Sequence, residues 1–301
     1  MSGDEQRSLA ALLLEPHGAP ITAADLSHVR ERVVRSLEPV TSKLHPGTVL
    51  TLDRHTLSTA LLRPGLCSQP PEPFAPSASR CKRSIGLSAV SMCSRQLILS
   101  NRRRSRHKEH ALARPVAPAE AVSRVLKSGE EDLVSAQFKP PWWAEWYTSL
   151  GRGARAVVQA EATTFATVLW KSIDWETLEG PPRFDLRTYW SCPPGRKLTL
   201  YGKADLSYRQ AGHHVLLVLL GGMPQTSWRF ELGFPALVAS LRRGLGAAPG
   251  RVIGFWPASG QVRSVRVDAE MLETTAEAAV EASAVWVHGR VEARDRVGRL
   301  S

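Results

Sequence analysis

The fold is decided by residues 202–222, in which Gly202-Lys203-Ala204-Asp205-Leu206 precedes the apolar run HHVLLVLL at 213–220 and the pair Gly221-Gly222. An apolar run of this length, with valines and closing glycines, is more typical of a strand buried on both faces than of a helix. The five residues from Gly202 end a second strand. We therefore expect the run at 213–220 to lie in the middle of a sheet.

The chain after this run predicts how the sheet continues. A helix is expected at 234–243 and a short apolar strand at 251–256. A connection through one helix joins parallel strands, because a parallel crossover needs about a dozen residues. Residues 182–267 thus read as three strands, a helix and two strands. They predict an α/β domain whose mixed sheet of about five strands is flanked by helices.

The residues before this core predict a helical N-terminal layer, 22–181. Thr22 and Asp25 have the spacing of a capping box, which opens a helix expected to end at Glu38 because Pro39 follows. The other expected elements are a strand at 49–52 and helices at 54–62, 85–99 and 153–175. We predict one domain at 22–289 that closes with a helix at 268–289, a disordered segment at 1–21 and a flexible tail at 290–301.

Charge is the most unusual property of the chain. The formal net charge is +11 and the pI is near 10.0, which favours an anionic partner, nucleic acid first and acidic protein or lipid second. Nine Lys and Arg residues and no acid lie between Arg80 and Lys108. The densest part offers candidate phosphate contacts at Arg102, Arg103, Arg104, Arg106 and Lys108. The alternative is a solvated basic loop.

Other patterns bear on location and on aromatic and thiol sites. No apolar stretch approaches the roughly 20 residues of a membrane span, and the N-terminus does not resemble a signal peptide, so a cytoplasmic protein is expected. The four cysteines form no CxxC pair and are expected to be free, buried thiols. Trp142, Trp143, Trp146 and Tyr147 favour a packed aromatic cluster over a base-stacking surface.

Four segments carry a resemblance to a known family: 201–206 (YGKADL), 215–222 (VLLVLLGG), 231–237 (ELGFPAL) and 251–256 (RVIGFW). They resemble a strand ending in G-[KR]-[VA]-D-L, a strand V-[LI]-[VI]-D-L-K-T-G, a helix D-L-R-F-Y-A-L and the strand after it. This is the pattern of the PD-(D/E)XK nuclease superfamily, in particular of the RecB-like nucleases found widely in actinobacteria. Residues 82–91 and 50–67 resemble the family's upstream segments more weakly.

The resemblance implies a nuclease core whose catalytic positions are mostly lost. Such enzymes gather carboxylates and a lysine around Mg²⁺ or Mn²⁺. Asp205 matches the first acid of the motif, and Lys203 precedes it by two residues. The remaining matched positions carry Val218 and Leu220 for the D-x-K pair, Leu87 and Ser91 for the helix His and Glu, and Pro235 for an aromatic residue.

Three functions are compatible with this departure. The first is a pseudo-nuclease that needs no metal and binds nucleic acid or an acidic protein. The second is an active Mg²⁺- or Mn²⁺-dependent nuclease with a migrated site, in which Asp205 and Glu231 hold the metal and Lys203 assists. Glu161, His213 and His214 are further possible ligands for that site. The third is a scaffold subunit, or a fold recruited to an unrelated reaction.

Overall fold

The structure is a computed structural model in which the chain forms two compact units. The sheet unit comprises residues 1–7, 12–73 and 185–301, and the helical unit comprises 8–11 and 74–184. The structure describes residues 9–15, 21–45, 47–62, 78–106, 116–135, 139–193, 195–210, 213–243 and 248–298.

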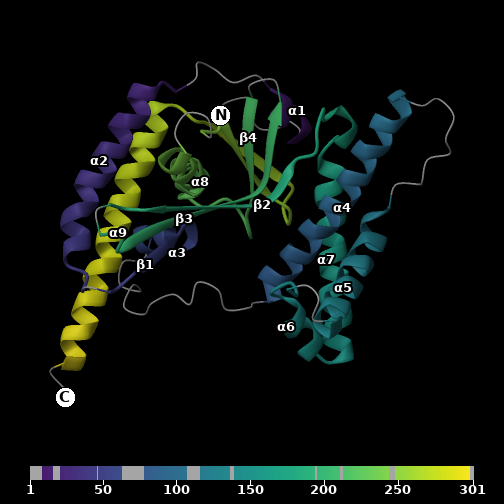
Figure 1. Ribbon diagram of the computed structural model, residues 1–301, viewed down its shortest axis with the longest axis horizontal. Coiled ribbons are helices and arrows are strands. Elements are labelled where there is room, and N and C mark those ends of the chain that lie inside the picture. The colour runs from purple at the N-terminus through teal and green to yellow at the C-terminus, as the bar shows by residue number, and fades with distance from the viewer. Residues whose placement is uncertain are drawn as a thin grey trace. The chain divides into compact units, whose positions relative to one another are not determined.

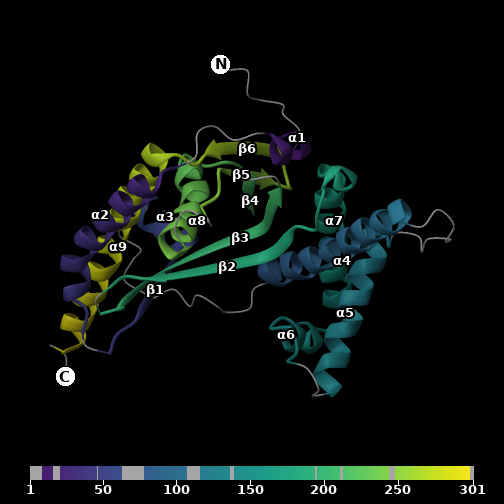
Figure 2. The same cartoon turned by 45° about the horizontal axis from the view of Figure 1, so that its top comes forward.

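A mixed, open six-stranded sheet forms the centre of the sheet unit. Its strands are β1 (Leu50–Asp53), β2 (Arg183–Ser191), β3 (Leu198–Gln210), β4 (His213–Leu219), β5 (Arg251–Trp256) and β6 (Gln261–Arg266). The order is β1-β3-β4-β5-β6, and β2 pairs with β3. Figure 2 shows β6, β5, β4, β3 and β2 following one another. The predicted α/β class is confirmed, with six strands instead of about five.

Helix α8 (Trp228–Arg243) connects β4 to β5, which are parallel as the sequence predicts. It lies close to the sheet at two glycines. A Cβ on Gly202 of β3 would lie 2.9 Å from Val238, and one on Gly254 of β5 would lie 2.8 Å from Leu232. Both distances are too short for a real side chain, so glycine sets how closely α8 packs. Gly254 pairs with Val218, which therefore faces α8 as well.

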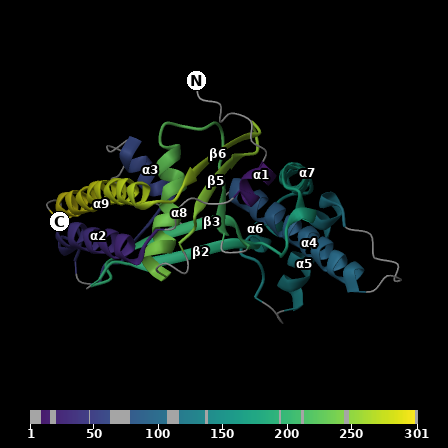
Figure 3. The same ribbon diagram turned by 90° about the horizontal axis from the view of Figure 1, so that it is seen from above.

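The other helices of the sheet unit pack around α8. They are α2 (Ala23–Ser42), α3 (Arg54–Leu62) and α9 (Ala269–Gly298). Helices α2 and α9 lie side by side (Figures 1 and 3), and α9 also contacts α3 and α8. The indole Nε1 of Trp286 donates to the carbonyl of Thr56 at 2.9 Å, which fixes α9 on α3. The capping box at Thr22 and Asp25 is confirmed.

Several helix ends differ from the sequence prediction. Helix α2 continues through Pro39 to Ser42, where the Thr41 and Ser42 hydroxyls donate to the Glu38 and Pro39 carbonyls. Serine and threonine thus bind carbonyls at the helix end, where backbone donors are lacking. Helix α9 continues past 289, where Arg, Glu and Ala are among the residues and are good helix formers. A short α1 (Leu9–Leu14) forms within the segment expected to be disordered.

The helical unit contains α4 (Ala78–Arg106), α5 (Pro118–Ser135), α6 (Ala144–Ser149), α7 (Arg152–Ser172) and the 3₁₀ turn η2 (Trp175–Thr177). Helix α4 contacts both α5 and α7. It is longer at both ends than the expected 85–99, and the arginines after 99, which are good helix formers, favour the extension at its C-terminal end. Within the part of the chain that the structure describes, no helix has the length and apolarity to cross a membrane.

Candidate functional site

Asp205 is fully buried and binds the backbone of a neighbouring strand. Its Oδ2 accepts a hydrogen bond from the N–H of Leu219, 2.7 Å away at the end of β4. A buried N–H without an acceptor costs about 1–3 kcal/mol. The carboxylate that the family resemblance marks as catalytic therefore stabilises the sheet.

Asp205 also lies where the side-chain alternation of β3 changes phase. Gly202 and Val218 both face α8. The antiparallel register pairs Leu206 with Leu217, so regular alternation would place Gly202 and Val218 on opposite faces. The alternation must therefore shift between them, as it does at a β-bulge. At this irregularity the Asp205 carboxylate accepts the hydrogen bond of the Leu219 N–H, which in a regular ladder would go to a backbone carbonyl.

The matched D-x-K positions are part of the core. Val218 is 0% exposed and Leu220 is 6% exposed, and both belong to the hydrophobic cluster that contains α8. Pro235 of α8 also packs on the sheet, since its Cα lies 3.4 Å from the position of a Cβ on Gly202. Helix α8 begins at Trp228 and not at 234 as expected, and the Ser227 hydroxyl donates to the Glu231 carboxylate across its first turn.

Lys203 forms an ion pair with an acid that the sequence did not indicate. Its Nζ lies 2.9 Å from Oδ1 of Asp185 on β2, and Oδ2 of Asp185 accepts from the Arg187 guanidinium at 2.6 and 2.9 Å. Partial burial acts to raise the pKa of Asp185, but Lys203 and Arg187 outweigh it and hold that pKa below its ordinary value. Asp185 has a φ of +52°, in the left-handed region.

Two tyrosines continue this row of side chains. The rings of Tyr189 on β2 and Tyr201 on β3 are stacked, with centroids 4.7 Å apart and planes at 23°. The next pair, Ser191 and Thr199, shares a hydrogen bond of 2.9 Å, so the contacts run antiparallel along the two strands. Burial raises the pKa of Tyr201 despite the nearby Arg187. The sequence carries one signal for this row: the spacings Arg187-x-Tyr189 and Tyr201-x-Lys203 place a cation and a tyrosine on the same face of each strand.

The other ligands considered for a migrated metal site do not join Asp205. Glu231 accepts from the Ser227 hydroxyl at 3.0 Å in the first turn of α8. His214 is buried and its ring nitrogens lie 3.0 Å from Ser207 Oγ and 3.3 Å from the Arg209 guanidinium. The side chain of His213 lies outside the described residues.

The upstream candidates lie in the helical unit. Leu87 is buried on α4, Ser91 is half-buried on the same helix, and Glu161 of α7 forms an ion pair with Lys82 of α4. Glu161 therefore has a structural role in this unit, because its ion pair with Lys82 joins α7 to α4. The backbone at Arg102, Arg103, Arg104 and Arg106 belongs to the last turns of α4. Their side chains, and Lys108 entirely, lie outside the described residues.

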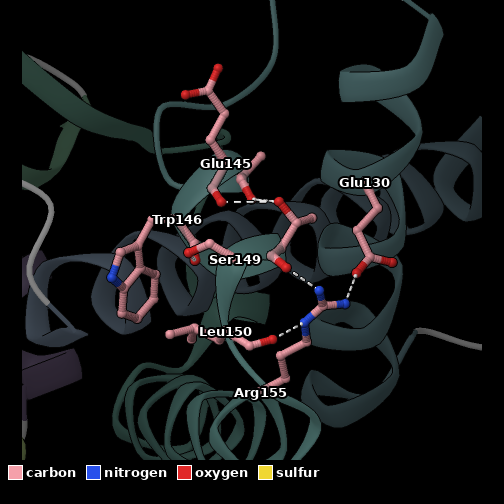
Figure 4. Close-up of polar contacts among 8 residues, drawn as sticks. Glu130, Glu145, Trp146, Ser149, Leu150 and Arg155 are labelled. Carbon is pink, nitrogen blue, oxygen red and sulfur yellow. Dashed lines mark hydrogen bonds and ion pairs between the residues drawn. The ribbon is translucent and has the colours of Figure 1, made fainter.

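A dense group of polar contacts in the helical unit is centred on Arg155 of α7 (Figure 4). Its guanidinium donates to the carbonyl of Leu150 at 2.9 Å and to that of Thr148, and it pairs with Glu130 of α5 at 3.3 Å. It also lies over the ring of Tyr147, 5.6 Å from the centroid. Arg155 thus satisfies carbonyls at the end of α6, and all its contacts serve the packing of α5, α6 and α7.

The aromatic cluster of the same unit is largely packed. Trp143 is buried and meets Tyr147 edge to face, with centroids 6.3 Å apart. Trp142 is 42% exposed. The structure thus supports packing for Trp143 and Tyr147.

A second cationic cluster lies at the start of α8. The guanidinium carbons of Arg229 and Arg263 lie 5.4 and 5.2 Å from the ring centroid of Trp228. Arg229 and Arg263 are exposed, and Trp228 also packs against the hydrophobic core. Two cations held over one indole place positive charge at a defined position on the α8 side of the sheet.

The described cysteines are expected to be unreactive in the folded protein. Cys81, Cys93 and Cys192 are buried and free, and burial raises the pKa of each thiol to about 11. Only the thiolate is nucleophilic, so iodoacetamide at about pH 8 should leave these three residues unmodified until urea is added. Peptide mass spectrometry before and after unfolding measures this. Modification of the Cys93 peptide in the folded protein would contradict the expectation.

Comparison with known proteins adds no relative. No family model matches the chain, and no curated protein is significantly similar to it. Among the described residues, no three His, Cys, Asp or Glu side chains form a group that could hold a metal ion.

Proposed function

We propose that the chain is a catalytically degenerate member of the PD-(D/E)XK nuclease superfamily that binds nucleic acid without cleaving it. One observation carries the proposal: the carboxylate of Asp205 accepts the N–H of Leu219. The two positions that would complete a metal site, Val218 and Leu220, are buried in the core.

The order of elements supports the assignment. Strands β2, β3 and β4 are consecutive in the chain, and α8 then leads to β5, parallel to β4. The resemblance implies the same order of strand, strand, helix and strand for β3, β4, α8 and β5. The motif residue Asp205 lies on β3, as the resemblance requires.

The donor set at Asp205 does not fit a divalent metal ion. Mg²⁺ and Mn²⁺ prefer several oxygen ligands, and Val218 and Leu220 offer only aliphatic carbon. Asp205 already accepts a backbone hydrogen bond. Lys203, which would have assisted, is paired with Asp185. These residues therefore support no metal-dependent step.

Charge supports nucleic acid over an acidic protein as the partner. The chain carries +11, and the basic run that includes residues 102–108 contains no acid. A series of arginines adjacent in sequence suits a polyanion with regularly spaced phosphates. The Trp228 cluster adds two further cations on the sheet unit.

The proposal is tested by the salt dependence of DNA binding. A variant with Gln at the four arginines 102, 103, 104 and 106 should lower the slope of log affinity against log salt by about 3, since each phosphate contact contributes about 0.7–0.9. A control that removes equal charge replaces four exposed arginines. They are Arg30, Arg35, Arg152 and Arg242.

Two results would overturn the proposal. No measurable DNA affinity of the wild type, or a slope that is equal for the wild type and both variants, would favour the scaffold alternative. Cleavage of DNA with Mg²⁺ or Mn²⁺ that Asp205→Ala abolishes would favour the active nuclease with a migrated site.

A further inference from the structure

We propose that the β2–β3 ladder, defined as Asp185, Arg187 and Tyr189 with Tyr201 and Lys203, binds a base and its adjoining phosphates in single-stranded nucleic acid. This inference rests on the proposed function and adds a second contact surface and a strand preference to it. The ladder lies outside the Asp205 position and outside the basic run of α4.

The geometry of the sheet gathers these five side chains on one face. Gly202 faces α8, so its neighbours Tyr201 and Lys203 face away from that helix. Tyr189 stacks on Tyr201, and Arg187 and Asp185 follow it at intervals of two along β2. The ladder is therefore a continuous row on the face of the sheet opposite α8.

The tyrosine pair offers a platform for a base. Tyr201 is 8% exposed and Tyr189 is 41% exposed, so the inner ring is anchored and the outer ring is open to solvent. A base that stacks on Tyr189 would extend the existing stack. Base–aromatic stacking of this kind is tolerant of base identity, since every base has a π-face.

The cations next to the tyrosines suit phosphate. The side chains of Arg187 and Lys203 are 40% and 36% exposed, and they share the single carboxylate of Asp185. Within the ladder two positive charges face one negative charge, and Asp53, the register partner of Tyr201 on β1, adds a second carboxylate beside that ring. The planar guanidinium of Arg187 can also bind a phosphate through two hydrogen bonds, which a point charge such as an ammonium group cannot do with the same geometry.

The backbone of Asp185 is a second sign of a constructed site. A non-glycine residue at φ +52° is unfavourable, although Asp and Asn tolerate this region better than most residues. Such conformations persist where surrounding contacts hold them, and they are more common at functional sites. This conformation places the Asp185 carboxylate between Arg187 and Lys203, where it holds both cations in position.

The exposed ring favours a single strand over a duplex. In a duplex the base faces are covered by their neighbours, so an aromatic side chain gains nothing by stacking unless a base is unpaired. Phosphate contacts alone would serve both forms of DNA equally. We therefore expect Tyr189 to contribute to the binding of single strands only.

The test measures fluorescence anisotropy of a labelled oligothymidylate and of a duplex of equal length. Tyr189→Leu should weaken binding to the single strand about tenfold and leave duplex binding unchanged. Tyr189→Phe keeps the ring and should bind as the wild type does. Asp185→Asn keeps the φ tolerance and frees both cations, so it should tighten binding to both probes.

The outcomes separate this inference from the proposed function. If the wild type binds DNA and Tyr189→Leu, with an unchanged melting temperature, retains single-strand affinity, the ladder inference is wrong and the proposed function stands. If the wild type binds neither probe, both are wrong. If Tyr189→Leu does not fold, Asp185→Asn decides, because unchanged affinity in that variant would refute a role for the cations.

Discussion

A chain carrying Val218→Asp and Leu220→Lys, which restores the family's D-x-K pair, is expected to unfold at neutral pH and not to gain nuclease activity. Val218 is fully buried against α8, so the new carboxylate would enter a close-packed apolar core. An unpaired buried charge costs several kcal/mol, and the whole domain is stabilised by only about 5–15 kcal/mol. Urea denaturation followed by circular dichroism measures the loss.

The pH dependence of Val218→Asp alone identifies the cause. Burial would raise the pKa of the new carboxyl above the value of about 3.9 that it has in the unfolded chain. Above about pH 4 the folded state then binds more protons than the unfolded state, so stability falls as the pH rises. Val218→Thr, which has a similar shape and no charge, should lose less stability and show no such slope. A stable double variant that cleaves DNA with Mg²⁺ would show that the site is still open.

The sheet was predictable because its signals are local. The run at 213–220 is apolar on both faces, and the helix between β4 and β5 requires parallel pairing. Proline was a misleading signal at Pro39, which lies inside α2. The end of α2 is stabilised by the hydroxyls of Thr41 and Ser42, which donate to backbone carbonyls. Those hydroxyl contacts cannot be read from the residue type alone.

The site was less predictable because it depends on strand register. Lys203 and Asp205 are two residues apart, so regular alternation along a strand would place them on one face. The irregularity of β3 next to Asp205 buries that residue, whereas Lys203 reaches Asp185 across the β2–β3 pair. No periodicity indicates a bulge or chooses a cross-strand partner 18 positions earlier in the chain. The tyrosine stack was missed for the same reason.

Asp205→Ala is expected to destabilise the sheet unit by about 2–3 kcal/mol, because the buried N–H of Leu219 would lose its acceptor and a cavity would remain. Asp205→Asn is the matched control, since its side-chain carbonyl can still accept that hydrogen bond. We expect the Asn variant to lose about 1 kcal/mol or less. Urea denaturation of the three proteins gives the comparison.

Hydrogen exchange at Leu219 tests the same contact directly. If Asp205 holds the end of β4, the amide of Leu219 should exchange faster in Asp205→Ala than in Asp205→Asn or the wild type. A catalytic aspartate predicts the reverse, because active-site carboxylates are placed for chemistry at a cost in stability. Unchanged stability and unchanged exchange in Asp205→Ala, with loss of a metal-dependent cleavage activity, would therefore return this residue to a catalytic role.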